Sequence, residues 1–183
     1  MHRMLRFVTA ILLALPIFLA SCTANQKEST LTRADMRFEE GDFRGAIVDY
    51  SLVLEEDPKL ARAYNNRGVA RLRLGDFQGA LLDLDQALSL TPYIGEGYYN
   101  RALARFSLGE IDGAIADYTE AIRFTPRYSK ALAGRGHARS KKGDLDGAIT
   151  DFKASLESAT EDWPDRKAVE AELARVQKAR DGK

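Results

Sequence analysis

Apolar and small residues recur three and four positions apart along most of the chain, with polar residues between them. In 77–90, for example, Phe77, Ala80, Leu84 and Leu88 share one helical face, and the polar Gln86 and Ser89 lie on the opposite side. The same spacing returns in seven other segments. It predicts helices over 29–40, 43–56, 61–74, 77–90, 95–108, 111–124, 129–142 and 145–158.

A short pattern of glycine, acidic residue, apolar residue, any residue, glycine and alanine separates the members of each pair of segments. It begins at Gly41, Gly75, Gly109 and Gly143, which are 34 residues apart. The first glycine suits the left-handed end of one helix, and the acidic residue suits the cap of the next. A fixed period of this size predicts stacked helical hairpins in place of one closed globule.

The repeats add further residues at fixed positions: Tyr64 and Tyr98 in an aromatic slot, the Leu-Gly-Asp triplet at 74–76, the small residue Ala80 and the closing Pro92. With these residues the repeats resemble the tetratricopeptide repeat family. The resemblance covers about residues 27–162. The resemblance implies an all-α fold, a tetratricopeptide helical-hairpin solenoid of about four repeats.

A further amphipathic segment, about 164–180, follows the repeats. Pro164 is expected in its first turn, Val169, Leu173 and Val176 lie on one face, and Trp163 would anchor it. A repeat array needs an end element that covers its last apolar face. We therefore expect four repeats over 30–162 and a capping helix over 163–183.

The start of the chain has the pattern of an export signal. Arg3 and Arg6 precede an apolar run, 7–20, that is too short to span a membrane. The following Leu-Ala-Ser-Cys resembles the lipobox of bacterial lipoproteins, which implies a signal peptide over 1–21, a lipidated Cys22 and a tether over 22–29. In that family a residue such as Thr23 after the cysteine implies the outer membrane, facing the periplasm. The alternative is an ordinary signal peptide in which the cysteine stands by chance.

Composition narrows the possible chemistry. The chain has 27 basic and 27 acidic residues, so no overall positive charge favours a nucleic acid partner. His137 is the only histidine outside the signal, and Cys22 is the only cysteine. These counts supply no metal cluster and no Cys–His pair, and we expect no catalytic residue, no cofactor and no enzymatic activity.

Arginine and aspartate recur with the same period and lie 16 residues apart within each repeat. This spacing places them on the two facing helices of one hairpin, where bidentate pairs can form. The alternative is a basic stripe that binds an anionic ligand. The pairs expected to be structural are Arg67 with Asp83, Arg101 with Asp117, and Arg135 with Asp151.

The resemblance also implies a concave groove, lined by the first helix of each hairpin, that binds an extended or helical peptide. Asparagine amides would bond the peptide backbone, and apolar side chains would take its side chains. The alternative is that aromatic residues such as Phe106 only pack against the next repeat. The groove residues transferred by position are Asn65, Asn66, Val69, Tyr99, Asn100, Leu103, Phe106, Lys130 and His137.

These features together favour a non-enzymatic, membrane-anchored adaptor that binds protein or peptide partners. Similar lipoproteins act in cell-envelope assembly or peptidoglycan remodelling. The alternative function is a periplasmic carrier of a small anionic ligand or a cell-wall fragment.

Overall fold

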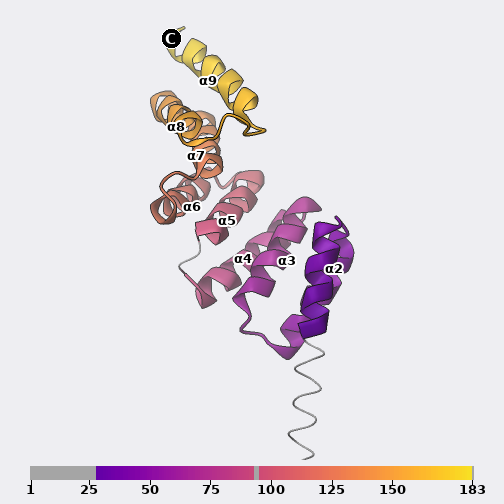
Figure 1. Cartoon of the computed structure of the whole chain (residues 1–183). Coiled ribbons are helices and arrows are strands. Elements are labelled where there is room, and N and C mark those ends of the chain that lie inside the picture. Colours follow the sequence, from indigo (N-terminus) through magenta and orange to yellow (C-terminus); the bar gives the residue numbers. More distant parts are fainter. Residues whose placement is uncertain (1–27, 93–94, 183) are drawn as a thin grey trace, which may run out of the picture. The chain divides into compact units, whose positions relative to one another are not determined.

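The computed structural model describes residues 28–92 and 95–182. The predicted signal peptide, Cys22 and most of the predicted tether lie outside these ranges. Every regular element in the described ranges is a helix, as the sequence predicted (Figure 1). None of these helices is both long and apolar enough to cross a membrane.

The chain divides into two compact units, with the boundary between Lys59 and Leu60. The first unit contains one hairpin, made of a helix over 28–39 and α2 (Phe43–Glu56). Its helices enclose the fully buried Ala34, Ala46 and Tyr50. The Tyr50 hydroxyl donates to Asp35 Oδ1 across the hairpin at 2.7 Å.

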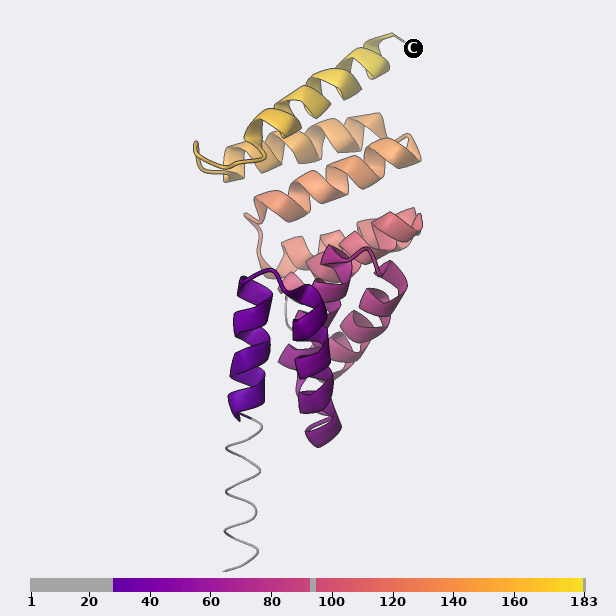
Figure 2. The same ribbon diagram turned by 90° about the vertical axis from the view of Figure 1, so that its right-hand side faces the viewer.

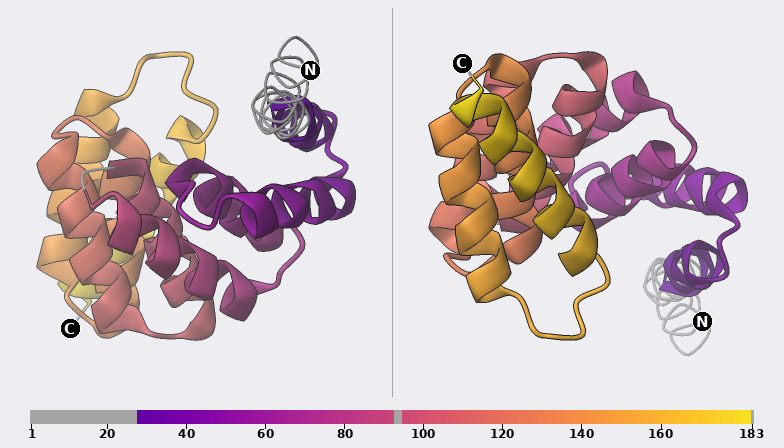
Figure 3. Two further views of the ribbon diagram at one scale, coloured as in Figure 1. Left: turned by 90° about the horizontal axis from the view of Figure 1, so that it is seen from below. Right: turned by 90° about the horizontal axis from the view of Figure 1, so that it is seen from above.

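The second unit contains three hairpins and a last helix. In each hairpin the two helices pack together, and the second helix also packs on the first helix of the next hairpin (Figures 1 and 2). Helix α9 lies against α8 at the end of this unit (Figure 3). The helices are α3 (Ala61–Arg73), α4 (Phe77–Leu90), α5 (Gly95–Leu108), α6 (Ile111–Phe124), α7 (Ser129–Lys142), α8 (Leu145–Ser158) and α9 (Arg166–Asp181).

The repeated glycine and acidic residues form the junction inside each hairpin. All four first glycines have positive φ, from 78° at Gly75 to 90° at Gly143. The carboxylates of Asp42, Asp76 and Asp144 accept the N–H three residues ahead, at 2.9–3.0 Å. Glu110 makes no such cap, and its Oε2 lies 3.8 Å from Arg105 Nε. Glutamate is one methylene longer than aspartate, so it caps less well.

The small residues of the repeat admit large neighbours across the hairpin. A Cβ added to Gly136 would lie 2.8 Å from Cε1 of the buried Phe152, and one added to Gly68 would lie 2.9 Å from Cγ of Leu84. A Cβ on Gly147 would collide with the Asp144 carboxylate that caps α8. These glycines therefore allow close packing and capping, although alanine is the better helix former.

The last helix begins later than the sequence predicted. Helix α9 starts at Arg166, and Pro164 lies in the turn before it. Arg166 explains the shift, since its Nη2 donates to the carbonyls of Leu156, in the last turn of α8, and Ala159, the residue after it, at 3.0 and 3.2 Å. These bonds hold 159–165 as a compact turn. Trp163 packs there against the cluster that contains Val169 and Val176.

Candidate functional site

Each hairpin of the second unit contains a buried aspartate held by two arginines. The first arginine makes a bidentate pair: Arg67 reaches Asp83 at 3.0 and 2.7 Å. The second arginine reaches the same carboxylate at 2.7–2.9 Å. The remaining bidentate pairs join Arg101 to Asp117, at 2.9 and 2.7 Å, and Arg135 to Asp151, at 2.9 and 2.8 Å.

This pairing decides whether the periodic arginines are structural or form a cationic binding surface. The carboxylates are 2–4% exposed at the side chain, so each hairpin encloses a negative charge that its arginines compensate. In the first unit the Arg33 hydrogen bond lowers the pKa of Asp49, against the opposing effect of burial, and the charges of Arg33 and Arg37 lower it further. The arginines therefore hold helices together and do not form a cationic stripe.

The asparagines of α3 and α5 form a small amide cluster. Asn100 Nδ2 donates to Asn65 Oδ1 at 3.4 Å, and Asn65 Nδ2 donates to Asn66 Oδ1 at 3.3 Å. Asn100 is buried, whereas Asn65, Asn66 and Val69 are half-buried. The accessible amides on this part of α3 are consequently those of Asn65 and Asn66.

The aromatic residues of α5 pack into the core and also reach the surface. The Tyr99 ring lies 5.0 Å from that of Tyr128 and 6.0 Å from that of Tyr118. Leu103 and Phe106 pack against the same cluster, and both are half-buried, as is Tyr99. Burial raises the pKa of all three tyrosines, so their hydroxyls are neutral at physiological pH. Each of these side chains therefore packs against the core with one part and is accessible to a ligand with the other.

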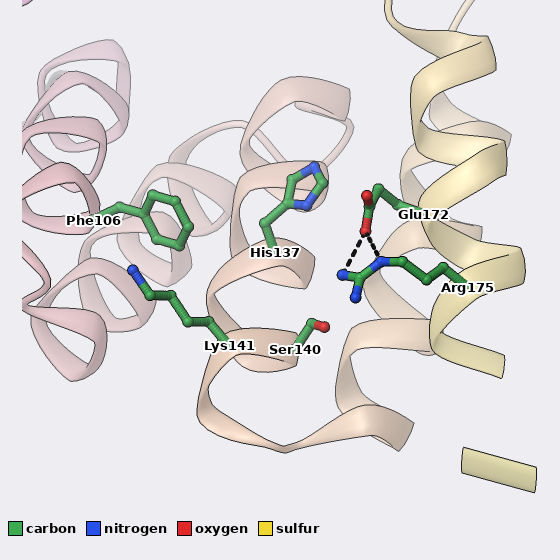
Figure 4. Close-up of a pocket in the computed structure, with 6 residues that line it drawn as sticks. All are labelled: Phe106, His137, Ser140, Lys141, Glu172 and Arg175. Carbon is green, nitrogen blue, oxygen red and sulfur yellow. Dashed lines mark hydrogen bonds and ion pairs between the residues drawn. The ribbon is translucent and has the colours of Figure 1, made fainter. Parts of the chain in front are cut away.

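A pocket of about 610 Å³ lies between α5, α7 and α9 (Figure 4). We call it the α9 pocket. The Lys141 ammonium lies 5.1 Å from the centre of the Phe106 ring. Arg175 Nε donates to Glu172 Oε2 at 2.9 Å, and Arg175 Nη2 forms an ion pair with the same oxygen at 2.7 Å. Its lining residues are Phe106, His137, Ser140, Lys141, Glu172 and Arg175.

His137 is the one histidine among the residues that line this pocket. Its ring meets that of Phe152 edge-on, with 5.0 Å between the centres. Burial lowers the pKa of His137, Glu172 raises it and Arg175 lowers it again. The imidazole is therefore mostly neutral at pH 7 and presents one N–H donor. No group of three metal-ligating side chains occurs in the described ranges.

The pocket joins predicted residues to others that the sequence interpretation missed. Phe106 and His137 come together there, whereas Lys130 is exposed and does not line it. Ser140, Glu172 and Arg175 were not expected. One sequence signal was available for Arg175: it stands 34 residues after Lys141 and so continues the repeat phase into the capping helix.

Comparisons with known proteins agree with this geometry. A family model described as "TPR repeat" matches residues 34–75 and 102–143, and one described as "Tetratricopeptide repeat" matches residues 61–94. Together they cover more than half of the chain. The chain belongs to the tetratricopeptide repeat family. No curated protein matches it.

Three solved structures with the same fold differ in their sequence identity to this chain. A crystal structure of MamA is 30% identical, with 72% of this chain and 77% of that chain covered and a TM-score of 0.69. The first TPR of Spaghetti (RPAP3), bound to the HSP90 peptide SRMEEVD, is 25% identical, with 65% and 91% covered and a TM-score of 0.61. YrrB, described as a TPR protein with an unusual peptide-binding site, is 18% identical, with 83% and 76% covered and a TM-score of 0.71.

The fold prediction is therefore confirmed: an all-α tetratricopeptide solenoid of about four repeats with a capping helix. The chain is a repeat scaffold of the class that binds proteins and peptides.

Proposed function

We propose that this protein is a non-enzymatic, membrane-anchored adaptor that holds an extended segment of a partner protein. The binding surface is the face of α3 and α5 that carries Asn65, Val69, Tyr99 and Leu103, which we call the α3/α5 face. A lipid on Cys22 anchors the protein to the outer membrane on its periplasmic side. The partner belongs to cell-envelope assembly or peptidoglycan remodelling.

The observation that supports peptide binding is the mixture of half-buried groups on the α3/α5 face. The amides of Asn65 and Asn66 can bond a peptide backbone regardless of its sequence. Val69, Leu103 and the ring of Tyr99 offer apolar surface beside them. This combination suits an extended peptide, and the tetratricopeptide domain of Spaghetti was solved with a peptide bound.

The support for anchoring comes from the sequence. One acyl chain binds a membrane only marginally, so a diacylated and amino-acylated Cys22 would supply the two or more chains that stable anchoring needs. Because the first helix already begins at residue 28, the segment left as a flexible tether is 23–27, which would span about 12 Å root-mean-square. The repeats would then lie near the membrane surface, within reach of partners there.

Site-specific photo-cross-linking in cells tests the peptide-binding part. A photoreactive residue at Val69, half-buried on α3, should capture a protein that the same residue at Leu82 does not capture. Leu82 is 66% exposed on α4 and provides the matched control, because it lies outside the α3/α5 face. Equal capture from both positions would contradict a partner held on this face.

Metabolic labelling with a fatty acid tests the anchor. Wild-type protein should incorporate label, and Cys22→Ser should lose it and leave the membrane fraction or remain as precursor. Undiminished labelling of Cys22→Ser would refute the lipid anchor without bearing on the α3/α5 face.

A further inference from the structure

We propose that the α9 pocket binds an acidic side chain of the partner segment held on the neighbouring α3/α5 face. This inference rests on the proposed peptide binding and specifies the chemistry of the ligand. It assigns a role to Lys141, and it makes a pocket beside the capping helix part of the binding site.

The first observation is the charge of the pocket. Among the described residues no carboxylate is paired with Lys141, whose ammonium lies over the Phe106 ring. Arg175 is paired with Glu172, which leaves the pocket one positive charge in excess while His137 is neutral. The next residue provides a contrast, since Lys142 Nζ lies 2.6 Å from Asp112 Oδ1. A carboxylate from a ligand would give Lys141 the partner that Lys142 already has.

The second observation is the supply of hydrogen-bond donors. His137 contributes an imidazole N–H, Ser140 a hydroxyl, and Lys141 an ammonium, all from successive turns of α7 (Figure 4). No hydrogen bond joins these three side chains to another described residue. A carboxylate has two oxygens and can accept from several donors at once, whereas an amide has one oxygen and brings an N–H₂ group that would face the ammonium.

The third observation is the position of the pocket relative to the α3/α5 face. Phe106 lines the pocket from α5, and Leu103 precedes it by one turn of the same helix. Both side chains are half-buried and pack against the same core cluster, so apolar surface of α5 lies on the face and also at the pocket. A segment lying on Leu103 can place its next side chain over Phe106 and its carboxylate beside Lys141. Arg73 occupies the position of α3 that corresponds to Lys141 in the repeat, 68 residues earlier, and it is exposed there without lining the pocket.

The test is an NMR titration of the full-length ¹⁵N-labelled chain, purified in mild detergent, with two peptides of blocked ends. One is acetyl-Ala-Leu-Glu-Glu-Leu-Ala-amide, and the other replaces both glutamates by glutamine. We expect the glutamate peptide to bind about fivefold more tightly, the size of one partly exposed charge pair. Its addition should shift the amide signals of Phe106, Ser140 and Lys141.

Matched variants locate the effect. Lys141→Gln should remove the preference for the glutamate peptide, and Lys142→Gln, which changes the same charge one residue away, should retain it. Added salt should weaken the preference, because exposed charge pairs are screened. The free-acid form of the glutamine peptide separates a terminal carboxylate from an acidic side chain: tighter binding of that form than of the glutamate peptide would overturn our assignment of the source.

Three results would overturn the proposal. The first is equal affinity of the glutamate and glutamine peptides. The second is a preference for the glutamate peptide that Lys141→Gln and Lys142→Gln reduce equally. The third is that sodium phosphate alone shifts the amide signals of the pocket residues as much as the glutamate peptide does. Equal peptide affinities with shifts at Val69 and Leu103 would contradict the binding of an acidic side chain in the pocket and would leave the proposed peptide binding on the α3/α5 face intact. Failure of the cross-linking experiment would instead remove the peptide-binding surface itself.

Discussion

The buried aspartates make the sharpest stability prediction, and Asp151 is the best site to test it. Its carboxylate, 2% exposed, accepts from Arg135 at 2.9 and 2.8 Å and from Arg139 at 2.9 Å. In Asp151→Ala the Arg135 guanidinium, 15% exposed at the side chain, keeps only a 3.2 Å bond to Thr119 Oγ1. We expect a loss of about 3 kcal/mol, the lower part of the range for a broken buried pair.

Removing the stranded charge should restore part of that loss. In Asp151→Ala, Arg139 retains its hydrogen bond to Gly147 O at 3.4 Å and its ion pair with Asp144 Oδ2 at 3.6 Å. Arg135 retains no carboxylate partner, so its positive charge is the one that the substitution leaves unpaired. The double variant Asp151→Ala with Arg135→Leu replaces this charge by an apolar side chain. We expect it to be about 1–2 kcal/mol more stable than Asp151→Ala alone.

Urea unfolding followed by far-ultraviolet circular dichroism measures the difference, provided that the slope with urea is unchanged. The control is Asp146→Ala, whose side chain is 83% exposed and whose Oδ1 lies 3.6 Å from Arg180, and it should change stability by less than about 0.5 kcal/mol. A double variant no more stable than Asp151→Ala would refute the argument that stranded charge causes the loss.

Three other predictions concern packing, capping and pH. Gly136→Ala should destabilise by about 1–3 kcal/mol in urea unfolding, because the new methyl group meets the Phe152 ring, although helix propensity alone predicts a gain. Asp76→Ala should cost about 1 kcal/mol in the same assay through its lost cap, and Glu110→Ala, which loses no cap, should cost clearly less. Burial in the folded state lowers the pKa of His137 below its ordinary value of 6.5. Just below pH 6.5 the folded protein therefore binds fewer protons than the unfolded chain, so the free energy of unfolding should fall as the pH drops from about 7. His137→Gln should flatten this part of the stability curve, measured by urea unfolding at several pH values.

Opposite results would each identify an error. A gain in stability from Gly136→Ala would mean that α7 and α8 can separate to admit the methyl group. Equal costs for Asp76→Ala and Glu110→Ala would show that the cap bond contributes little. A His137→Gln protein with the wild-type pH dependence would assign that dependence to other groups.

Helix positions and their ends were predictable from the sequence because they depend on neighbours along the chain. The spacing of Phe77, Ala80 and Leu84 sets the buried face of α4, and Gly75 with Asp76 ends one helix and starts the next. Six of the segments predicted within the described ranges have the bounds that the structure shows. The start of α9 was missed, because Arg166 bonds to carbonyls at the end of another helix.

The candidate site was only partly predictable, because its composition depends on which helices meet. The repeat phase assigned Phe106 and His137 to one face, and it assigned Asn100 to that face as well, where the structure buries it. The α9 pocket joins positions 106, 137–141 and 172–175, and its Glu172–Arg175 pair comes from a helix outside the repeats. No local spacing relates these segments.

The sequence by itself thus determined the repeat, the helical phase and the residue types that can pair, since each follows from the period of 34 and from the geometry of a single helix. Tertiary structure decided which charges are compensated. Arg135 and Lys141 are both cations of α7, yet packing against α8 gives Arg135 a buried carboxylate, while Lys141 lies over Phe106 at an open pocket. The distance to a partner on another helix makes that difference, and only the packed helices set it.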